Sequence, residues 1–150
     1  MTPPDVEASL NLLHKLKSVD SEIAEEGVKY IIFLVDSRTL FDVALGMYDF
    51  ELVLMVAQHS QRDPKEYLPF LRELQGMETD VQRFHIDDHL RRYKKALANI
   101  YKADGHLETF ITYTQDHDLY TYALELSKGD SDNNKVSLLR LFDYCQLIIS

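Results

Sequence analysis

The sequence predicts an all-α fold made of packed helical hairpins, and three observations support this prediction. Apolar residues recur at the helical spacing along most of the 150 residues. Helix-start signals follow one another at short intervals, each an acidic or hydroxyl residue placed directly before an apolar stripe. The apolar run 52–57 shows no β-alternation and lies between helical patterns, so we interpret it as a helix as well.

The length and composition favour one intracellular domain. A chain of 150 residues can bury about 70% of its unfolded surface, so we expect a single helical-repeat module over residues 1–150. The formal net charge of -9 argues against a general nucleic-acid binder, which needs clustered basic residues. The only cysteine, Cys145, excludes an internal disulfide and suits a reducing compartment. We expect the cytoplasm, with the nucleus as a further location.

Two further features of the sequence concern membrane contact and the length of the natural chain. Apolar runs such as 30–35 and 52–57 fall far short of the roughly 20 residues that a membrane span needs, so we expect no membrane contact. The sequence stops at residues 147–150 within an apolar helical face. We therefore expect this module to be a piece of a longer chain.

Four helices are expected in the first 60 residues, and the last of them is central. Their start signals are Asp5, Asp20 or Ser21, Asp36 or Ser37, and Asp49. The helix after Asp49 is apolar on nearly every face over residues 50–57, so protein must surround it.

The following helix has the best-marked start in the chain. Asp63 can accept from the backbone N–H groups of the first turn, and Glu66 completes a capping box. Pro64 has no N–H group, but at the first helical position this group would have no partner within the helix, so no hydrogen bond is lost. Pro69 lacks a backbone donor and predicts a kink. Gly76 suits a left-handed residue that ends the helix.

The second half of the sequence predicts further helices. A weak capping box at 79–82 begins a short helix, and the apolar stripe 86–100 predicts a long helix after it, ended by residues 103–105. Beyond these, the pattern predicts helices over 107–114, 119–124 and 138–148, and a loop at 129–134.

An aromatic-x-x-Ala-Leu pattern occurs three times, at Phe41–Leu45, Tyr93–Leu97 and Tyr120–Leu124. In each copy the small alanine allows a neighbouring helix to approach closely, while the aromatic and leucine side chains fill the groove beside it. This packing is typical of helix-hairpin repeats, although the tetratricopeptide period of about 34 residues is missing. We therefore predict an α-solenoid with degenerate tetratricopeptide-like repeats, and keep an irregular helical bundle as the alternative.

Candidate catalytic residues are few. His85 and His89 lie four residues apart on one helical face, a spacing that can bind zinc, but Ile86 stands where a metalloprotease motif has Glu. His117-Asp118, together with this His pair and Asp143, could serve an all-α metal-dependent phosphohydrolase. Capping and solvation explain the same side chains, so we predict no enzyme, no catalytic residue, no metal and no cofactor. The phosphohydrolase is kept as the alternative.

Arg91, Arg92, Lys94 and Lys95 form the only basic group in this acidic sequence, with Arg83 one helix earlier. On a helix these charges flank the apolar stripe, which favours a solvated face that pairs with acidic neighbours. The alternative is a contact with RNA phosphates or with an acidic partner.

One stretch carries a specific family resemblance. The motif Asp63-Pro64-x-Glu66-Tyr67-Leu68-Pro69-Phe70-Leu71 is long and unusual, and matching residues extend around it over residues 40–127. They are Tyr48-Asp49, Leu54-x-Val56-Ala57, Ser60-Gln61, Met77-Glu78-Thr79, Gln82-Arg83-Phe84, Ile86-Asp87, Leu90-x-Arg92-Tyr93-x-Lys95-Ala96 and Asp118-Leu119-Tyr120-x-x-Ala123-Leu124. With these residues the sequence strongly resembles the largest subunit of the Elongator complex, the IkappaB-kinase-complex-associated protein family.

The resemblance implies a non-catalytic scaffold segment. Members of that family carry two β-propellers and then a helical solenoid, dimerise through their C-terminal part, and hold the other subunits of a complex that modifies wobble uridines of tRNA. This sequence resembles an internal piece of the solenoid, without a propeller pattern and without the family's basic tRNA-binding segment. The implied partners are the other Elongator subunits, with homodimerisation outside this piece and only indirect contact with tRNA. A generic helical-repeat interaction module is a further alternative.

Overall fold

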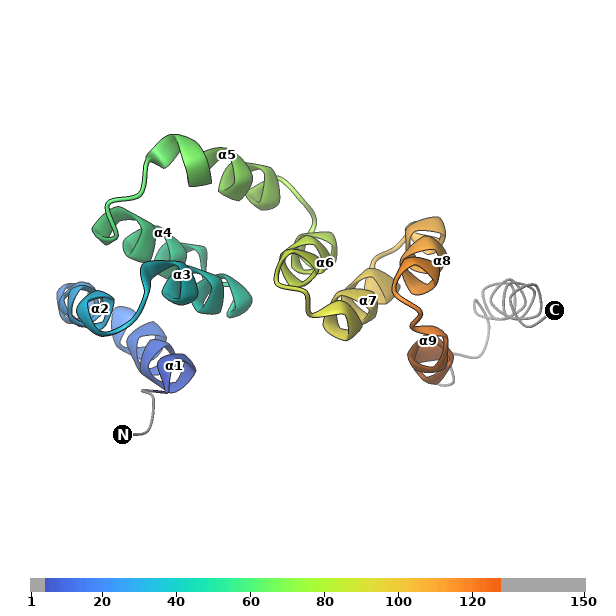
Figure 1. The fold of residues 1–150 in the computed structure, drawn as a ribbon, viewed down its shortest axis with the longest axis horizontal. Coiled ribbons are helices and arrows are strands. Elements are labelled where there is room, and N and C mark those ends of the chain that lie inside the picture. The colour runs from blue at the N-terminus through green and yellow to red at the C-terminus, as the bar shows by residue number, and fades with distance from the viewer. Residues whose placement is uncertain (1–4, 128–150) are drawn as a thin grey trace. The chain divides into compact units, whose positions relative to one another are not determined.

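A computed structural model describes residues 5–127, and in this range all regular secondary structure is α-helical (Figure 1). The chain divides into two compact units, which we call unit 1 (Met1–Gly76) and unit 2 (Met77–Ser150). Unit 1 contains α1 (Val6–Lys17), α2 (Ser21–Leu34), α3 (Ser37–Gly46), α4 (Phe50–His59) and α5 (Pro64–Gln75). The described part of unit 2 contains α6 (Thr79–His89), α7 (Tyr93–Lys102), α8 (Leu107–Asp116) and α9 (Tyr120–Ser127).

These helices confirm the all-α prediction. Within the range 5–127 no helix is both long and apolar enough to cross a membrane. The expectation that residues 1–150 act as one module stays a prediction.

Short turns organise the helices into hairpins. Four connections of three residues, at 18–20, 47–49, 90–92 and 117–119, join helices that pack against each other. The hairpins are α1/α2, α3/α4, α6/α7 and α8/α9. In three of them the middle residue has a left-handed backbone, with φ 62° at Tyr48, 59° at Arg91 and 52° at Asp118. A non-glycine residue pays about 1 kcal/mol for this conformation, so the packing of the two helices imposes the tight turn.

Unit 1 is a stack of hairpins. α1 packs against α3 and α2 against α4, so the first hairpin lies on the second, and α5 packs against α4 (Figure 1). α4 is enclosed as predicted, because Leu52, Val53, Val56 and Ala57 are all fully buried. From α5, buried Tyr67 meets the ring of Phe41 edge-on, with ring centroids 6.5 Å apart.

In unit 2, α7 is the central helix of the described part. It packs against α6, α8 and α9. Its side chains Leu97 and Ile100 are fully buried and join a core to which α6, α8 and α9 all contribute. The buried members of this core are Phe84, Ala96, Leu97, Ile100, Ala103, Phe110, Ile111, Tyr113 and Ala123.

Acidic caps confirm the helix starts that the sequence predicts in unit 1. The capping side chains, each accepting from a backbone N–H two or three residues further on, are Asp5, Asp20, Asp36, Asp49 and Asp63. Of the two candidate caps for each helix, Asp20 rather than Ser21 caps α2, and Asp36 rather than Ser37 caps α3. Helices α6, α7 and α8 begin without a side-chain cap bond, so their starts carried weaker signals in the sequence.

Two predictions of local structure are wrong. The stripe 86–100 is not one long helix, because α6 ends at His89 and α7 begins at Tyr93. Phe84 of α6 and Leu97 and Ile100 of α7 belong to one core, so apolar residues on both sides of the break serve the same cluster. Gly76 has φ -78° rather than a left-handed backbone, since its N–H still bonds back to the carbonyls of the last turn of α5. The predicted loop at 129–134 and helix over 138–148 lie outside the described residues.

The alanines of the aromatic-x-x-Ala-Leu pattern mark close packing, as predicted. Ala44, Ala96 and Ala123 are all 0% exposed. Their places in the hairpins differ, however: Ala44 lies in the first helix of its hairpin, whereas Ala96 and Ala123 lie in the second helix. The pattern therefore identifies contact points between helices and does not mark one repeating unit.

Enlarging one of these contact points should destabilise unit 2. Ala96→Leu is expected to cost about 2 kcal/mol of unfolding free energy, because the added carbons have no space beside a fully buried Cβ. Urea-induced unfolding followed by circular dichroism measures the loss. Ala98→Leu on the same helix, where the side chain is partly exposed, is the control and should change stability by no more than about 0.5 kcal/mol. Equal losses in both variants would contradict the packing role.

Candidate functional site

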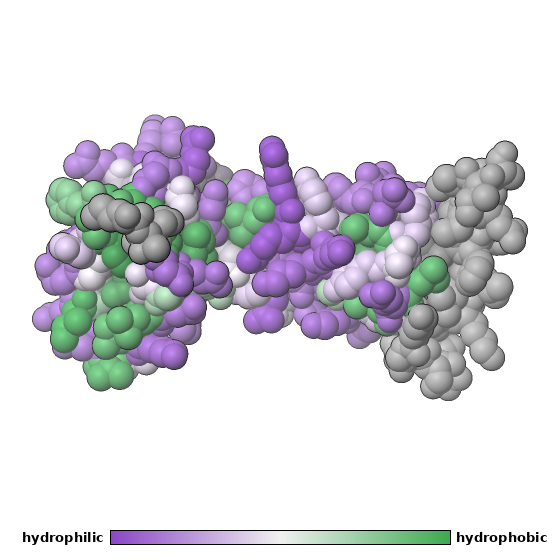
Figure 2. Space-filling model, turned by 60° about the horizontal axis from the view of Figure 1, so that its bottom comes forward, coloured by the Kyte–Doolittle hydropathy of each residue, from purple (hydrophilic) through white to green (hydrophobic). Residues whose placement is uncertain are grey.

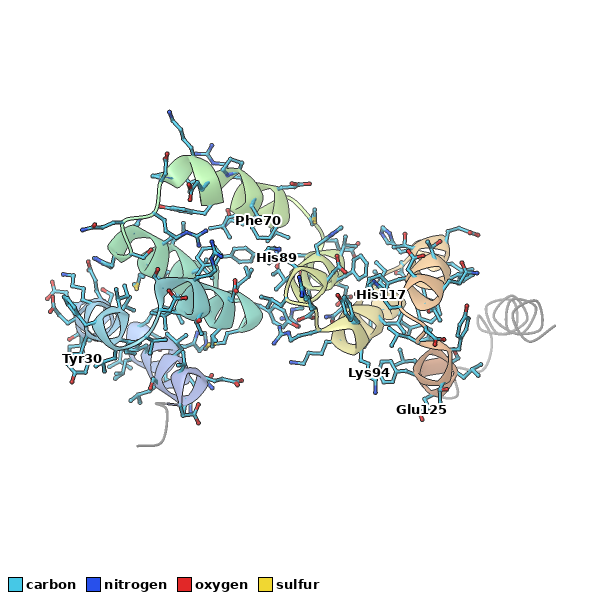
Figure 3. The ribbon with its side chains drawn as sticks, viewed as in Figure 1. Tyr30, Phe70, His89, Lys94, His117 and Glu125 are labelled. Carbon is cyan, nitrogen blue, oxygen red and sulfur yellow. The ribbon has the colours of Figure 1, made fainter. Side chains whose placement is uncertain are left out.

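The histidines of the alternative metal site do not converge. His85 and His89 are exposed on α6, and the His85 ring lies edge-on to its neighbour Phe84. His117 follows α8 and stacks on the ring of Tyr93, with centroids 4.1 Å apart. Figure 3 labels His89 and His117 and shows them at separate places in unit 2.

The phosphohydrolase alternative gains no support from these positions. Among residues 5–127 there is no group of three or more His, Cys, Asp or Glu side chains that could hold a metal ion. Asp118 occupies the tight turn before α9, where its left-handed backbone serves the hairpin. Asp143, the remaining ligand of this alternative, lies outside the described residues.

The fold divides the predicted basic group. Arg92 turns inward, and its guanidinium donates to the carboxylate of Asp87, whose side chain is 0% exposed. Arg91, Lys94 and Lys95 are exposed to solvent. Three of the four candidate contact residues therefore lie on the surface of unit 2, and the fourth supports its structure.

Asp87 is the centre of a polar network that the sequence did not predict. Asn99 of α7 donates to its carboxylate at 2.7 Å, so Asp87 links α6 to α7. Beside it, Tyr113 of α8 donates to Asp88 at 3.0 Å. Burial raises the pKa of Tyr113 and the hydrogen bond to Asp88 raises it further, so the hydroxyl keeps its proton and remains a donor. The network joins three helices of unit 2.

A second unpredicted network is centred on Asp49 in unit 1. This residue was identified only as the cap of α4, where its carboxylate accepts from the backbone N–H of Leu52 at 3.2 Å. In addition, Lys17 donates to both carboxylate oxygens at 2.6 and 2.7 Å, and His14 donates to one of them. Since Lys17 and His14 belong to α1, Asp49 ties the first hairpin to the start of α4.

The electrostatics of this network favour the charged forms. Burial alone would raise the pKa of Asp49, but the hydrogen bonds from Lys17, His14 and the Leu52 backbone outweigh it and hold the pKa below its ordinary value. Burial would likewise lower the pKa of Lys17, and its bonds to Asp49 and Glu51 reverse the shift and raise it. Both groups are therefore ionised near neutral pH and attract each other.

Stacked hairpins joined by such networks define an α-solenoid, a class of protein that presents extended surfaces built from neighbouring repeats. Two family models match the chain: ELP1 alpha-solenoid over residues 1–74 and ELP1 TPR domain over residues 81–145. The chain belongs to the Elongator complex protein 1 family. The predicted α-solenoid, its tetratricopeptide-like character and the family resemblance are confirmed.

Relatives with this name come from several different organisms. A protein named putative elongator complex protein 1 from Xenopus laevis is 50% identical over 129 residues, which cover 83% of the chain and 11% of the relative. Elongator complex protein 1 of Schizosaccharomyces pombe is 41% identical over 143 residues, which cover 95% of the chain and 11% of the relative. Elongator complex protein 1 of Drosophila melanogaster is 42% identical over 144 residues, which cover 95% of the chain and 12% of the relative. The chain thus spans about a tenth of the length of these curated relatives.

Proposed function

We propose that the chain is a non-catalytic scaffold segment of the Elongator complex that supports the assembly of its subunits. The observation that carries the proposal is the match of two structural family models, a solenoid and a tetratricopeptide domain, along most of the chain. The polar clusters of the described residues add support, because the carboxylates of Asp49 and Asp87 each accept from a side chain of a neighbouring helix and so hold helices together.

The finer parts of this proposal concern the whole protein. The segment supports a complex that modifies wobble uridines of tRNA in the cytoplasm, with the nucleus as a further location. Its partners are other Elongator subunits, homodimerisation occurs through regions outside this segment, and tRNA is contacted only indirectly, through other parts of the complex. The name shared by the relatives, Elongator complex protein 1, supports the membership on which these statements depend.

A charged residue in the core of unit 1 should disrupt the scaffold. Leu71 of α5 is 2% exposed, so Leu71→Asp in the full-length subunit places a carboxylate among apolar side chains. We expect a large loss of soluble subunit, of co-purifying partner subunits and of wobble-uridine modification in the same cells. Affinity purification and mass spectrometry of tRNA nucleosides measure these losses.

The control lies on the same helix. Gln75→Asp introduces the same side chain at an exposed position, and it should leave assembly and modification unchanged. Normal assembly and normal modification in Leu71→Asp would refute the scaffold role.

The exposed basic residues of unit 2 form a second candidate contact, with RNA phosphates or an acidic partner. Arg91, Lys94 and Lys95 lie near the start of α7, and the left-handed turn places Arg91 at the solvent-exposed end of the α6/α7 hairpin. Reversal of all three to Glu in the assembled complex should weaken tRNA binding, and weaken it most at low salt. Filter binding over a salt series measures this. Unchanged tRNA binding, with an unchanged set of bound subunits, would contradict the contact and favour the interpretation of these residues as a solvated face.

A further inference from the structure

An open pocket of about 610 Å³ lies at the ends of α2 and α4 in unit 1, and we call it the α2/α4 pocket. It is lined by Lys29 and Phe33 of α2 and by Asp36 in the turn after this helix. It is also lined by His59 at the end of α4 and by Gln61 in the turn that follows. Figure 2 shows apolar and hydrophilic residues side by side on the surface of unit 1, and the lining of this pocket is mixed in the same way.

The apolar part of this lining includes a bare aromatic ring. The side chain of Phe33 is 89% exposed. An aromatic face attracts a planar cation, and unit 1 already contains one such contact, since the guanidinium carbon of Arg62 lies 4.7 Å from the centroid of the Phe41 ring. Arg62 is engaged there, whereas the ring of Phe33 remains accessible to a partner.

Two helix ends give the pocket a negative potential. α2 ends at Leu34 and α4 ends at His59, and the C-terminal end of a helix carries a partial negative charge of about half an elementary charge. The last turn of α2 contains no basic side chain that would offset this charge. Within residues 5–127 the backbone carbonyls of Ile32, Phe33 and Leu34 accept no hydrogen bond. The end of α2 can therefore accept hydrogen bonds from a cationic donor.

Carboxylates also outnumber cations around the pocket. Lys29 is paired with Glu26 at 3.2 Å and with Glu25 at 4.0 Å, and His59 bonds to the same Glu25 at 3.0 Å. Asp36 uses one carboxylate oxygen to cap α3, while the other, Oδ1, accepts no hydrogen bond within residues 5–127. Three carboxylates thus exceed the charge of Lys29 even when His59 is protonated.

We propose that the α2/α4 pocket binds an arginine side chain from an exposed segment of another subunit of the complex. A guanidinium is planar, so it can lie on the ring of Phe33 while its five N–H groups donate to Asp36 and to the carbonyls at the end of α2. A lysine ammonium lacks the flat surface for the ring. Residues 1–75 carry 13 acidic and 7 basic side chains, so this part of the chain repels nucleic-acid phosphates.

The proposal rests on the scaffold role and adds the chemistry of one contact to it. Because the pocket is open and its polar groups lie at helix ends, its loss should weaken the docking of one segment and leave unit 1 folded. The two proposals therefore fail separately. Normal assembly in Leu71→Asp refutes the scaffold role, whereas the contact is tested in a subunit that is folded and assembled.

Site-specific photo-crosslinking in the full-length subunit, purified within its complex, tests the occupant. Phe33 is replaced by p-benzoylphenylalanine, which keeps an aromatic ring at this exposed position. Irradiation should link residue 33 to another subunit, at an arginine or at a residue next to one, as mapped by mass spectrometry. Replacement of that arginine by glutamine should then lower the yield of the link several-fold.

Four results would overturn the proposal. They are no link to any subunit, a link to a segment without arginine, a link to a second copy of the same chain, and a yield that does not change when the arginine is replaced. Co-expression of subunits labelled with light and heavy isotopes distinguishes a link within one copy from a link between copies.

Matched controls lie at the other end of α2. The same probe at Val19, which is 84% exposed and precedes α2, should give a several-fold lower yield of the arginine link. Asp36→Asn keeps a capping oxygen and removes the charge, so it should lower the yield from residue 33. Asp20→Asn makes the same change at the cap of α2 and should leave that yield unchanged. Equal yields in Asp36→Asn and Asp20→Asn, or at residues 33 and 19, would also overturn the proposal.

Discussion

Asp49→Ala is expected to lower the free energy of unfolding of unit 1 by about 4 kcal/mol, because it removes a buried carboxylate and leaves the largely buried Lys17 ammonium with the exposed Glu51 in place of a buried partner. The side chain of Asp49 is 5% exposed and that of Lys17 is 14% exposed, so water replaces the lost carboxylate poorly. About 1 kcal/mol of the loss belongs to the cap on the backbone N–H of Leu52. The remainder belongs to the bonds with Lys17 and His14.

A matched pair of variants separates these contributions. Asp36→Ala removes an exposed aspartate cap that forms no ion pair within residues 5–127, and it should cost only about 1 kcal/mol. Asp49→Asn keeps a capping oxygen but removes the charge, so it should cost less than Asp49→Ala and more than Asp36→Ala. Urea unfolding of the three variants measures the order. Equal losses in Asp49→Ala and Asp36→Ala would show that the ion pair contributes nothing.

The same carboxylate predicts a pH dependence. The pKa of Asp49 in the folded chain lies below its ordinary value of 3.8, so the folded form binds this proton more weakly than the unfolded form does. Its stabilising contribution is therefore complete above about pH 5 and is lost as the pH falls through the folded pKa. The difference in unfolding free energy between the parent chain and Asp49→Asn should shrink as the pH falls below 3.8. A difference that stays constant down to pH 2 would contradict the assignment.

The sequence predicts the helix starts of unit 1 well, because each cap is a local interaction. Asp20 and Asp36 bond to N–H groups two or three residues away, and that spacing is visible in the sequence. The burial of α4 also follows from composition, since a segment apolar on every face can only lie inside. Periodicity and capping therefore define the order of helices and the central one.

Contacts between distant residues leave no such local signal. Lys17 and His14 precede Asp49 by more than thirty residues, and as single residues they look like any solvated positions of an amphipathic helix. The basic group illustrates the same limit, because composition suggests one surface of four cations and only the fold shows that Arg92 is turned inward. Sequence reasoning identified the candidate contact residues and could not tell which of them support the structure.

The break between α6 and α7 depends on such a contact. The apolar stripe continues through residues 86–100, so periodicity predicts one helix, while the left-handed Arg91 and the link between Arg92 and Asp87 close a turn within it. The backbone N–H of Arg92 also donates to the carbonyl of Asp87 at 2.8 Å. Residue 87 therefore positions the turn through both its side chain and its main chain.

Asp87→Ala should lower the free energy of unfolding of unit 2 by about 3 kcal/mol, because it leaves the Arg92 guanidinium and the Asn99 amide without their carboxylate. The expected loss is smaller than for Asp49, since the Arg92 side chain is 33% exposed and water can take over part of its solvation. Urea unfolding measures the total, and hydrogen exchange of α6 and α7 amides shows where protection is lost.

Two comparisons make this result specific to the network. Asp104→Ala removes an exposed aspartate after α7 and should change stability by no more than about 0.5 kcal/mol. Asp87→Ala combined with Arg92→Ala should cost less than the sum of the two single losses, because neither charge is then left alone. Strict additivity would mean that the two side chains do not stabilise each other. In that case the turn between α6 and α7 would depend on the backbone bond from Arg92 to Asp87 and on the packing of the hairpin alone.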